Sequence, residues 1–343
     1  MLLMNDPVRF GILGCGTIAP THARVIAAAG DSVLAGAVSR RYAQAQAFAD
    51  RFSCRAYETY EQMLADDGID AVSICTPTGD HFANARQALL LGKHVMVEKP
   101  LCLTLPEADT LIALAKERGL CLGVISQSRF SDAAQAIRRM IDSGEAGRPV
   151  SAQLMMRFFR GQEYYDSAAW RGTFAGDGGG VIMNQGIHGI DLLCYLMGRP
   201  VSVTGYAKTR LRDIEVEDTV AAALEFENGA VAVIDATTCS VPSFEKRFIL
   251  GFEKGTIILE NDSITLWTVP GECPESCRVS LAGNTSADNK KVTAAYHTRE
   301  YANFIRHIRL GEPLIVDGAQ GRMPLSVILG VYESSRTGRR VDL

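Results

Sequence analysis

The sequence predicts an α/β protein in which a doubly wound parallel sheet is followed by an α+β domain with an open, mostly antiparallel sheet. Two observations carry this prediction. Short apolar segments alternate with helical segments over residues 8–126, which is typical of parallel βαβ units. Hairpin signals then dominate residues 201–259, and successive hairpins produce antiparallel sheets. Because 343 residues are many for one core, we expect two domains, at residues 1–128 and 129–343.

Hydrophobic periodicity places the elements of the first domain. Apolar runs of strand length predict strands at residues 8–13, 33–38, 70–75, 94–97 and 120–126. Apolar residues at helical spacing predict helices at residues 19–29, 42–52, 80–91 and 105–118.

The second domain is expected to start with a helix and then to become a sheet. The helix is predicted at residues 132–142, a turn at 144–149 and a strand at 150–158. Further strands are expected at residues 201–208, 218–226, 230–237, 246–252 and 256–259, with Asn228-Gly229 as a strong hairpin signal. Residues 160–172 and 270–291 read as loops, and helices at 296–309 and 320–335 close the chain.

Composition argues against several classes of function. Hydrophobic residues make up 47% of the chain and charged residues 22%, as in ordinary soluble proteins. The formal net charge of −4 gives no basis for nucleic-acid binding, and no apolar run reaches the roughly 20 residues of a membrane span. Residues 1–8 lack the features of a secretory signal. The nine cysteines lie mostly in apolar runs, and Cys273 and Cys277 have no histidine nearby, so we expect a cytoplasmic protein without a metal site.

A glycine motif joins the first expected strand to the first expected helix. The segment Gly14-Cys15-Gly16-Thr17-Ile18-Ala19 is G-x-G-x-x-A in the context that gives this motif its meaning. Gly14 allows the tight turn, Gly16 lets the backbone approach a pyrophosphate, and Ala19 keeps the helix close to the sheet. The helix N-terminus at Thr17 and Ile18 offers unpaired N–H groups to phosphates. The motif therefore predicts a dinucleotide-binding Rossmann domain.

The end of the second strand indicates which dinucleotide binds. An acidic residue about 20 residues after the glycines usually holds the ribose 2′-hydroxyl. Here Ser39 occupies that position, followed by Arg40 and Arg41. Without the carboxylate and with guanidinium groups nearby, a 2′-phosphate is tolerated or preferred, although both arginines could simply be a solvated helix start. We therefore expect NADP, with NAD as the alternative.

Two later strand ends also carry polar residues, and ligands bind at the strand ends of such sheets. Thr76 and Pro77 follow one strand, with His81 at the start of the next helix, and Glu98 and Lys99 follow another. Lysine is rarely buried without a partner. A pair with Glu98 is disfavoured because neighbours in a strand point to opposite faces. We expect these residues to line the cofactor site, with Lys99 also reaching the substrate.

A polar stripe follows the three glycines at residues 178–180 in an otherwise apolar segment. Read as one helix, Asn184, His188 and Asp191 fall at i, i+4 and i+7, within a narrow wedge. Polar groups on a buried helix must be hydrogen-bonded. An amide, an imidazole and a carboxylate together favour one wall of an active site. The alternative is a core helix whose histidine pairs with its own neighbours.

The loop at residues 160–172 leads into these glycines and is dense in aromatic and arginine side chains. Arg160, Trp170 and Arg171 offer flat faces and bidentate donors, which suit a sugar ring that carries an anionic group. A packed loop anchored by the tryptophan explains the same residues equally well.

Three motifs occur in order along the chain: Gly14/Gly16/Ala19, Glu98-Lys99-Pro100 and the three glycines followed by Asn184, His188 and Asp191. Together they resemble the Gfo/Idh/MocA oxidoreductases, the family of glucose–fructose oxidoreductase and inositol dehydrogenase. The resemblance extends along nearly the whole chain. It implies a Rossmann domain followed by a domain whose open sheet supports the substrate site and oligomerisation. It also implies a Lys99–Pro100 peptide bond that is often cis in the family.

One position departs from the common family pattern. Many members have Asp where this chain has Asn184, so a carboxylate–histidine relay is not assumed. An asparagine here resembles the UDP-N-acetylglucosaminuronate 3-dehydrogenase branch, whose members usually favour NAD.

The resemblance implies NAD(P)-dependent hydride transfer at a secondary alcohol or ketone of a sugar, cyclitol or nucleotide-sugar. In this hypothesis Lys99 moves the hydroxyl proton, His188 assists and Asn184 holds the substrate. The alternative that His188 is the base, with Lys99 only a hydrogen-bond donor, stays open. A same-fold dehydrogenase of a dihydrodiol-like substrate is one alternative. A non-catalytic NAD(P)-binding regulatory protein is another, but it would not need Lys99 and His188 together. We expect a homodimer or homotetramer formed through the C-terminal sheet.

Overall fold

The computed structural model describes residues 6–278 and 286–343, which form two compact units. Within these residues the first unit comprises 6–127 and 286–322, and the second comprises 128–278 and 323–343. The domain boundary expected after residue 128 did not anticipate that α10 (Ser286–Leu310) returns to the first unit.

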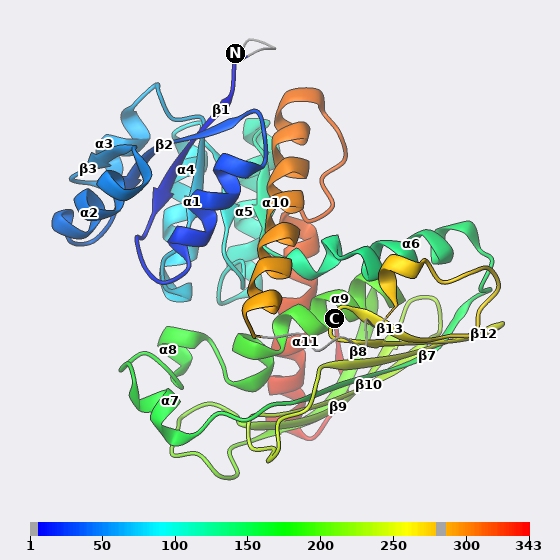
Figure 1. Cartoon of the computed structure of the whole chain (residues 1–343). Helices are drawn as coiled ribbons and strands as arrows, with labels where there is room; N and C mark the ends of the chain where they lie inside the picture. Colours follow the sequence, from blue (N-terminus) through cyan, green and yellow to red (C-terminus); the bar gives the residue numbers. More distant parts are fainter. Residues whose placement is uncertain (1–5, 279–285) are drawn as a thin grey trace. The chain divides into compact units, whose positions relative to one another are not determined.

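The first unit contains a parallel sheet in the strand order β3-β2-β1-β4-β5-β6. This is the order of doubly wound dinucleotide-binding sheets, and it confirms the predicted fold class. The strands β1, β2 and β3 of this sheet are labelled in Figure 1. In the described residues the strands are β1 (Val8–Leu13), β2 (Ser32–Val38), β3 (Arg55–Tyr57), β4 (Ala71–Ile74), β5 (His94–Val97) and β6 (Leu122–Val124). The sequence pattern missed β3 because three residues are too few to show a period.

Helices connect these strands, and their ends follow from local sequence. At the start of α5, Thr104 accepts a hydrogen bond from Glu107 N while the Glu107 side chain bonds back, which forms a capping box. The same helix ends at Gly119, whose φ of 62° is left-handed. The other helices in this part of the first unit are α1 (Ala19–Ala28), α2 (Tyr42–Phe52), α3 (Tyr60–Ala65) and α4 (His81–Leu90), with α5 spanning Leu105–Arg118 and a 3₁₀ turn η1 at Thr78–Asp80.

Helix α10 belongs to the first unit because its aromatic residues complete that unit's core. Tyr301 and Phe304 are fully buried, and their ring centroids lie 5.6 and 6.1 Å from that of Phe10 in β1. The helix was predicted to start at residue 296 but begins ten residues earlier, and residues 279–285 of the expected loop lie outside the described residues. None of the helices in the described residues is long and apolar enough to cross a membrane.

The second unit contains a sheet in the order β13-β12-β11-β7-β10-β9-β8-β14. Only the β7–β10 pair is parallel among its described strands, so the predicted mostly antiparallel sheet is confirmed. The hairpin at Asn228-Gly229 joins β9 and β10, and Gly229 has a φ of 84°. The strands are β7 (Pro149–Arg157), β8 (Pro200–Lys208), β9 (Thr219–Phe226), β10 (Val231–Thr237), β11 (Arg247–Phe252), β12 (Gly255–Glu260), β13 (Ser263–Trp267) and β14 (Val341–Asp342).

One face of this sheet packs against helices, and side chains on the other face of its central strands are exposed. On the packed face, Leu154 and Met156 of β7 lie against Gly189, where a Cβ would meet the Met156 sulfur at 2.6 Å. On the opposite face of β10, Val231 and Val233 are 53% and 47% exposed. The helical segments that lie wholly or mostly in the unit are η2 (Gln127–Phe130), α6 (Asp132–Ser143), α7 (Gln162–Asp166), α8 (Phe174–Asp177), the π-helix η3 (Val181–Gln185), α9 (Ile187–Met197), η4 (Glu275–Cys277) and α11 (Gly318–Thr337), whose first five residues belong to the first unit. The loop expected at residues 160–172 therefore contains a short helix, α7.

Candidate active site

The glycine turn after β1 has the geometry that a pyrophosphate requires. Gly14 has a φ of 94°, and a Cβ there would lie 2.8 Å from the carbonyl oxygen of Cys75, so only glycine fits. Gly16 and Thr17 are exposed, and no atom lies within 4 Å of the place where a Cβ of Gly16 would stand. The backbone at Gly16 is therefore open to a ligand.

Helix α1 begins directly after this turn without a side-chain cap. The N-cap residue Ile18 makes no capping hydrogen bond, the first turn has no acidic residue, and a proline lies at its start. Uncapped N–H groups at a helix N-terminus favour a phosphate. Ala19 is fully buried and holds the helix close to the sheet. The turn and the helix end together fit the pyrophosphate of a dinucleotide.

The strand end at β2 carries no carboxylate. Ser39 is nearly buried, and its hydroxyl donates to Gln44 Oε1 at 3.1 Å, while Gln44 Nε2 donates to the carbonyl of Cys15 at 2.8 Å. The Arg40 side chain is 88% exposed and lies 4.0 Å from Asp80, too far and too exposed for a strong ion pair. The guanidinium is therefore available to an anionic ligand at this strand end.

His81 ties the ends of β4 and β5 together. Its Nδ1 lies 2.7 Å from the carbonyl oxygen of Pro100, and its Nε2 lies 3.0 Å from that of Thr76. Burial lowers the pKa of His81 despite these two carbonyls. The Lys99–Pro100 peptide bond is cis, as the resemblance implied, and Pro77 lies exposed at the start of η1. His81 thus fixes the backbone around Lys99 and lies beneath the surface.

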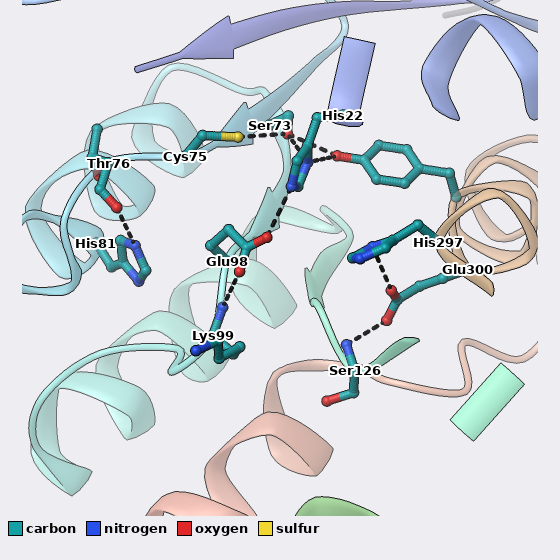
Figure 2. A network of polar contacts seen from close by, with 11 residues as sticks. His22, Ser73, Cys75, Thr76, His81, Glu98, Lys99, Ser126, His297 and Glu300 are labelled. Carbon is teal, nitrogen blue, oxygen red and sulfur yellow. Dashed lines mark hydrogen bonds and ion pairs between the residues drawn. The ribbon is translucent and has the colours of Figure 1, made fainter. Parts of the chain in front are cut away.

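Glu98 and Lys99 stand at the end of β5, and the Glu98 carboxylate makes two separate bonds (Figure 2). Its Oε1 lies 2.9 Å from Nε2 of His22, and its Oε2 accepts the backbone N–H of Lys99 at 3.1 Å. Lys99 is half-buried. The carboxylate therefore anchors the backbone of the residue that is predicted to move the proton.

Sequence reasoning missed His22 and its second partner, Tyr301. The Tyr301 hydroxyl lies 2.6 Å from His22 Nδ1, and both residues are fully buried. A histidine in the first helix after a glycine motif, on its buried side, was the available signal. No local pattern could connect it with a residue almost 280 positions later.

In the second unit, the glycine-rich segment is not one continuous α-helix. A π-helix spans Val181–Gln185, and α9 starts at Ile187. The wider π turn breaks the i, i+4, i+7 spacing, so the single-helix interpretation was wrong. Asn184 lies on the π-helix and His188 on the first turn of α9, and both are half-buried.

A carboxylate seven residues upstream supports Asn184. Asn184 Nδ2 donates to Asp177 Oδ1 at 2.8 Å, and Asp177 Oδ2 accepts the backbone N–H of Gly172 at 2.8 Å. Asp177 is 7% exposed. Because the amide N–H faces the carboxylate, the Asn184 carbonyl oxygen points away from Asp177 as an acceptor.

A second buried carboxylate, Glu217, anchors the glycines. Its two oxygens accept the backbone N–H groups of Gly180 at 2.8 Å and Ile182 at 3.1 Å. A Cβ on Gly180 would collide with the Glu217 carbonyl oxygen, so the close approach requires glycine. Burial raises the pKa of Glu217 to about 7, although the backbone donors oppose this shift. Sequence reasoning missed Glu217 because its contacts cross 35 or more residues.

The aromatic and arginine side chains before the glycines gather around Tyr164. The Arg171 guanidinium lies 4.5 Å from the Tyr164 ring centroid and 4.6 Å from that of Trp170, and Arg160 lies 5.5 Å from the Tyr164 ring. Gln185 Nε2 donates to the Tyr164 hydroxyl at 3.4 Å. The structure thus brings Arg160, Trp170 and Arg171 together and joins them to the π-helix.

Comparison with protein families assigns both halves of the sequence. Residues 8–126 match the oxidoreductase family with an NAD-binding Rossmann fold, and residues 134–258 match the GFO/IDH/MocA C-terminal domain. The chain belongs to the Gfo/Idh/MocA oxidoreductases. Its relatives in this family include UDP-N-acetylglucosamine 3-dehydrogenase of Acidithiobacillus ferrooxidans, 30% identical over 94% of this chain and 96% of that one. Myo-inositol 2-dehydrogenase of Thermotoga maritima is 25% identical over 98% of both chains.

Solved structures of Gfo/Idh/MocA dehydrogenases resemble the chain throughout. The WlbA dehydrogenase from Bordetella pertussis, in complex with NADH and UDP-GlcNAcA, is 31% identical, with a TM-score of 0.90 over 100% of this chain and 99% of that one. The WlbA dehydrogenase from Chromobacterium violaceum, with the same two ligands, is 30% identical, with a TM-score of 0.87 over 99% and 97% of the two chains.

In this Gfo/Idh/MocA protein, Asp191 of α9 is buried in an ion pair with Arg129. Its oxygens accept two hydrogen bonds from Arg129, at 2.7 and 2.8 Å, and the two side chains are 1% and 0% exposed. Burial lowers the pKa of Arg129, but the Asp191 carboxylate outweighs it and raises the pKa overall. The pair holds η2 against α9, so Asp191 is structural and the expectation that it forms part of the site wall was wrong.

Breaking this buried pair should destabilise the fold strongly. We expect Arg129→Met to lower the free energy of unfolding by about 3–5 kcal/mol, because Asp191 would be left buried without its partner. Urea denaturation followed by circular dichroism measures the change. Arg199→Met, which removes the exposed partner of Glu227, is the control and should cost less than about 1 kcal/mol. Equal losses in the two variants would contradict the assignment of Asp191 to structure.

Proposed function

We propose that this oxidoreductase transfers a hydride between a nicotinamide cofactor and a secondary alcohol of a UDP-linked amino sugar or its uronate. The observation that carries the substrate class is the match at 31% identity, over the whole chain, to a dehydrogenase whose structure contains NADH and UDP-GlcNAcA. The relative named UDP-N-acetylglucosamine 3-dehydrogenase supports the same class. A cyclitol is the second candidate, because inositol dehydrogenases match at 25–26% identity over nearly the full chain.

Substrate contacts are proposed for the second unit. The carbonyl oxygen of Asn184, directed by Asp177, would accept a hydrogen bond from a sugar hydroxyl. Arg160 and Arg171, grouped with Trp170 around one tyrosine, would contact the anionic part of the substrate. A screen that follows NAD(P)H absorbance with UDP-N-acetylglucosaminuronate, UDP-N-acetylglucosamine and myo-inositol tests the choice. If only myo-inositol is turned over, the substrate is a cyclitol and the proposal of a nucleotide sugar is wrong.

Lys99 is proposed to move the hydroxyl proton. When bound, the nicotinamide accepts or gives the hydride. A lysine in water has a pKa of about 10.4, too high to accept a proton at neutral pH. Partial burial and the positive charge of an oxidised nicotinamide both disfavour the ammonium form and would bring the pKa nearer to neutrality. His188 would orient the substrate, or would be the base itself with Lys99 as a hydrogen-bond donor.

Two variants separate these roles. We expect Lys99→Met to lower kcat by at least about 10²–10⁴-fold, which is what general acid–base catalysis contributes, with little change in cofactor affinity. His188→Asn should leave measurable activity. Steady-state kinetics with UDP-N-acetylglucosaminuronate provides the comparison, and Lys116→Met, which changes an exposed lysine of α5, is the control. Robust turnover by Lys99→Met would assign the role of proton-transfer residue to His188 instead.

For the cofactor, we expect NADPH to bind more tightly than NADH, because Ser39 replaces the usual acid and Arg40 is exposed beside it. A guanidinium–phosphate bond contributes on the order of 1.5–3 kcal/mol, or at least about tenfold in affinity. Arg40→Ala should remove the preference, and Arg118→Ala, at an exposed site at the end of α5, should retain it. Calorimetric titration measures both constants. Equal or tighter binding of NADH to the unmodified protein would contradict the interpretation of this strand end.

Assembly is proposed through the exposed face of the second unit's sheet. Val231 and Val233 are about half exposed there, and Val233 pairs across the strands with exposed Ala223. An exposed sheet face with apolar side chains suits a homodimer or homotetramer. Val233→Glu should shift the protein to smaller species in sedimentation velocity, whereas Val33→Glu, at an exposed valine of β2, should not. A monomeric unmodified protein would contradict this proposal.

A further inference from the structure

A buried polar network in the first unit is linked to Lys99 through Glu98 (Figure 2). At its centre is His22 of α1, which is fully buried. Its Nε2 lies 2.9 Å from Glu98 Oε1, and its Nδ1 lies 2.9 Å from Ser73 Oγ and 2.6 Å from the Tyr301 hydroxyl. Ser73 and Tyr301 are also hydrogen-bonded to each other, at 2.7 Å. The roles assigned so far use none of these contacts except the one to Glu98.

The groups that face His22 favour its positively charged form. Burial lowers the pKa of His22, but Cys75, Tyr301 and the Glu98 carboxylate together raise it well above the ordinary value for histidine. Burial raises the pKa of Tyr301 to about 12, so its hydroxyl is neutral near pH 7. Burial, followed by the charge of His22, lowers the pKa of His297 to about 4.

Glu300 is a further charged group of α10 near this network. One of its carboxylate oxygens accepts the backbone N–H of Ser126 at 2.6 Å, and the other lies 4.0 Å from His297. The direct carboxylate partner of His22 in the network is therefore Glu98, at 2.9 Å. Two opposite charges at this distance form a charge-assisted hydrogen bond.

The position of Glu98 makes its charge important for Lys99. The same carboxylate accepts the backbone N–H of Lys99, so a negative group lies beside the backbone of the residue whose amine must lose a proton. A carboxylate close to a lysine stabilises the ammonium form and works against a general base. A positively charged His22 bonded to Oε1 of Glu98 offsets this stabilisation of the ammonium form, while Oε2 holds the Lys99 backbone in place.

We propose that His22 is a positioning residue for Lys99: its imidazolium neutralises Glu98 and aligns the carboxylate that holds the Lys99 backbone. The inference rests on the proposed role of Lys99 in proton transfer. Ser73 and Tyr301 hold the imidazole ring from its other side, and Tyr301 brings α10 into the arrangement. In this proposal the network acts through Lys99.

The test separates the charge of His22 from its hydrogen bond. His22→Gln keeps an N–H donor for Glu98 but removes the positive charge. Lysine-selective ¹³C labelling lets NMR follow the titration of Lys99 in the free protein, with Lys99→Met identifying its signal. We expect the titration midpoint of Lys99 to rise by roughly one pH unit in His22→Gln. Glu98→Gln should lower the midpoint, and the double variant should return it toward the unmodified value.

Activity gives a second readout with UDP-N-acetylglucosaminuronate. In His22→Gln the pH profile of kcat/KM for alcohol oxidation should move to higher pH in parallel with the NMR midpoint, while KM stays unchanged. His307→Gln is the matched control, because His307 is a half-buried histidine of α10 whose Nδ1 faces the carbonyl of Glu312, outside the network. Its midpoint and profile should match those of the unmodified protein.

Each result decides the proposal. An unmoved Lys99 midpoint in folded His22→Gln overturns the role of His22 while leaving Lys99 as the proton-transfer residue if Lys99→Met is inactive. Turnover by Lys99→Met overturns the proposed function itself, whatever the NMR titration shows. If His22→Gln does not fold, Tyr301→Phe replaces it, because this change removes the hydroxyl at 2.6 Å and keeps the ring. In Tyr301→Phe, a Lys99 midpoint that rises, but by less than the roughly one pH unit expected for His22→Gln, supports the proposal. An unmoved Lys99 midpoint in this variant overturns it.

Discussion

The arrangement of the first unit's site depends on the two hydrogen bonds of the Glu98 carboxylate. One oxygen faces a histidine from α1, and the other holds the backbone of the following lysine. Three segments that are distant in sequence, α1, the end of β5 and α10, meet around this group and its partners. A buried carboxylate is costly unless it is bonded on both sides, so the fold and the position of Lys99 stabilise each other.

The second unit uses the same physical solution with different residues. Glu217 accepts two backbone N–H groups from the glycine segment, and Asp177 bonds the Asn184 amide as well as a backbone N–H. In each case a carboxylate holds the backbone near Asn184, the residue proposed to contact the substrate. Asn184, which lacks the charge common in the family, thereby gains a defined amide orientation from a neighbouring acid.

Most elements of the fold could be predicted because each rests on a local pattern: the glycine turn at Gly14, the alternation of strands and helices, and the hairpin at Asn228-Gly229. The polar partners could not. His22 looks like any residue of an apolar helix until Glu98 and Tyr301 are placed beside it. The π-helix was missed for a related reason, since a regular helix was assumed for a segment whose first N–H groups bond to the distant Glu217.

The buried carboxyl of Glu217 also makes folding of the second unit a proton-binding event. Its pKa is about 7 in the folded chain, against an ordinary value of 4.5. Between these values the folded form holds a proton that the unfolded chain gives up, so this site contributes stability below about pH 4.5 and loses it as the pH rises through about 7. Unfolding near pH 6 therefore releases a proton from this site, and the heat measured in a calorimeter depends on which buffer receives it.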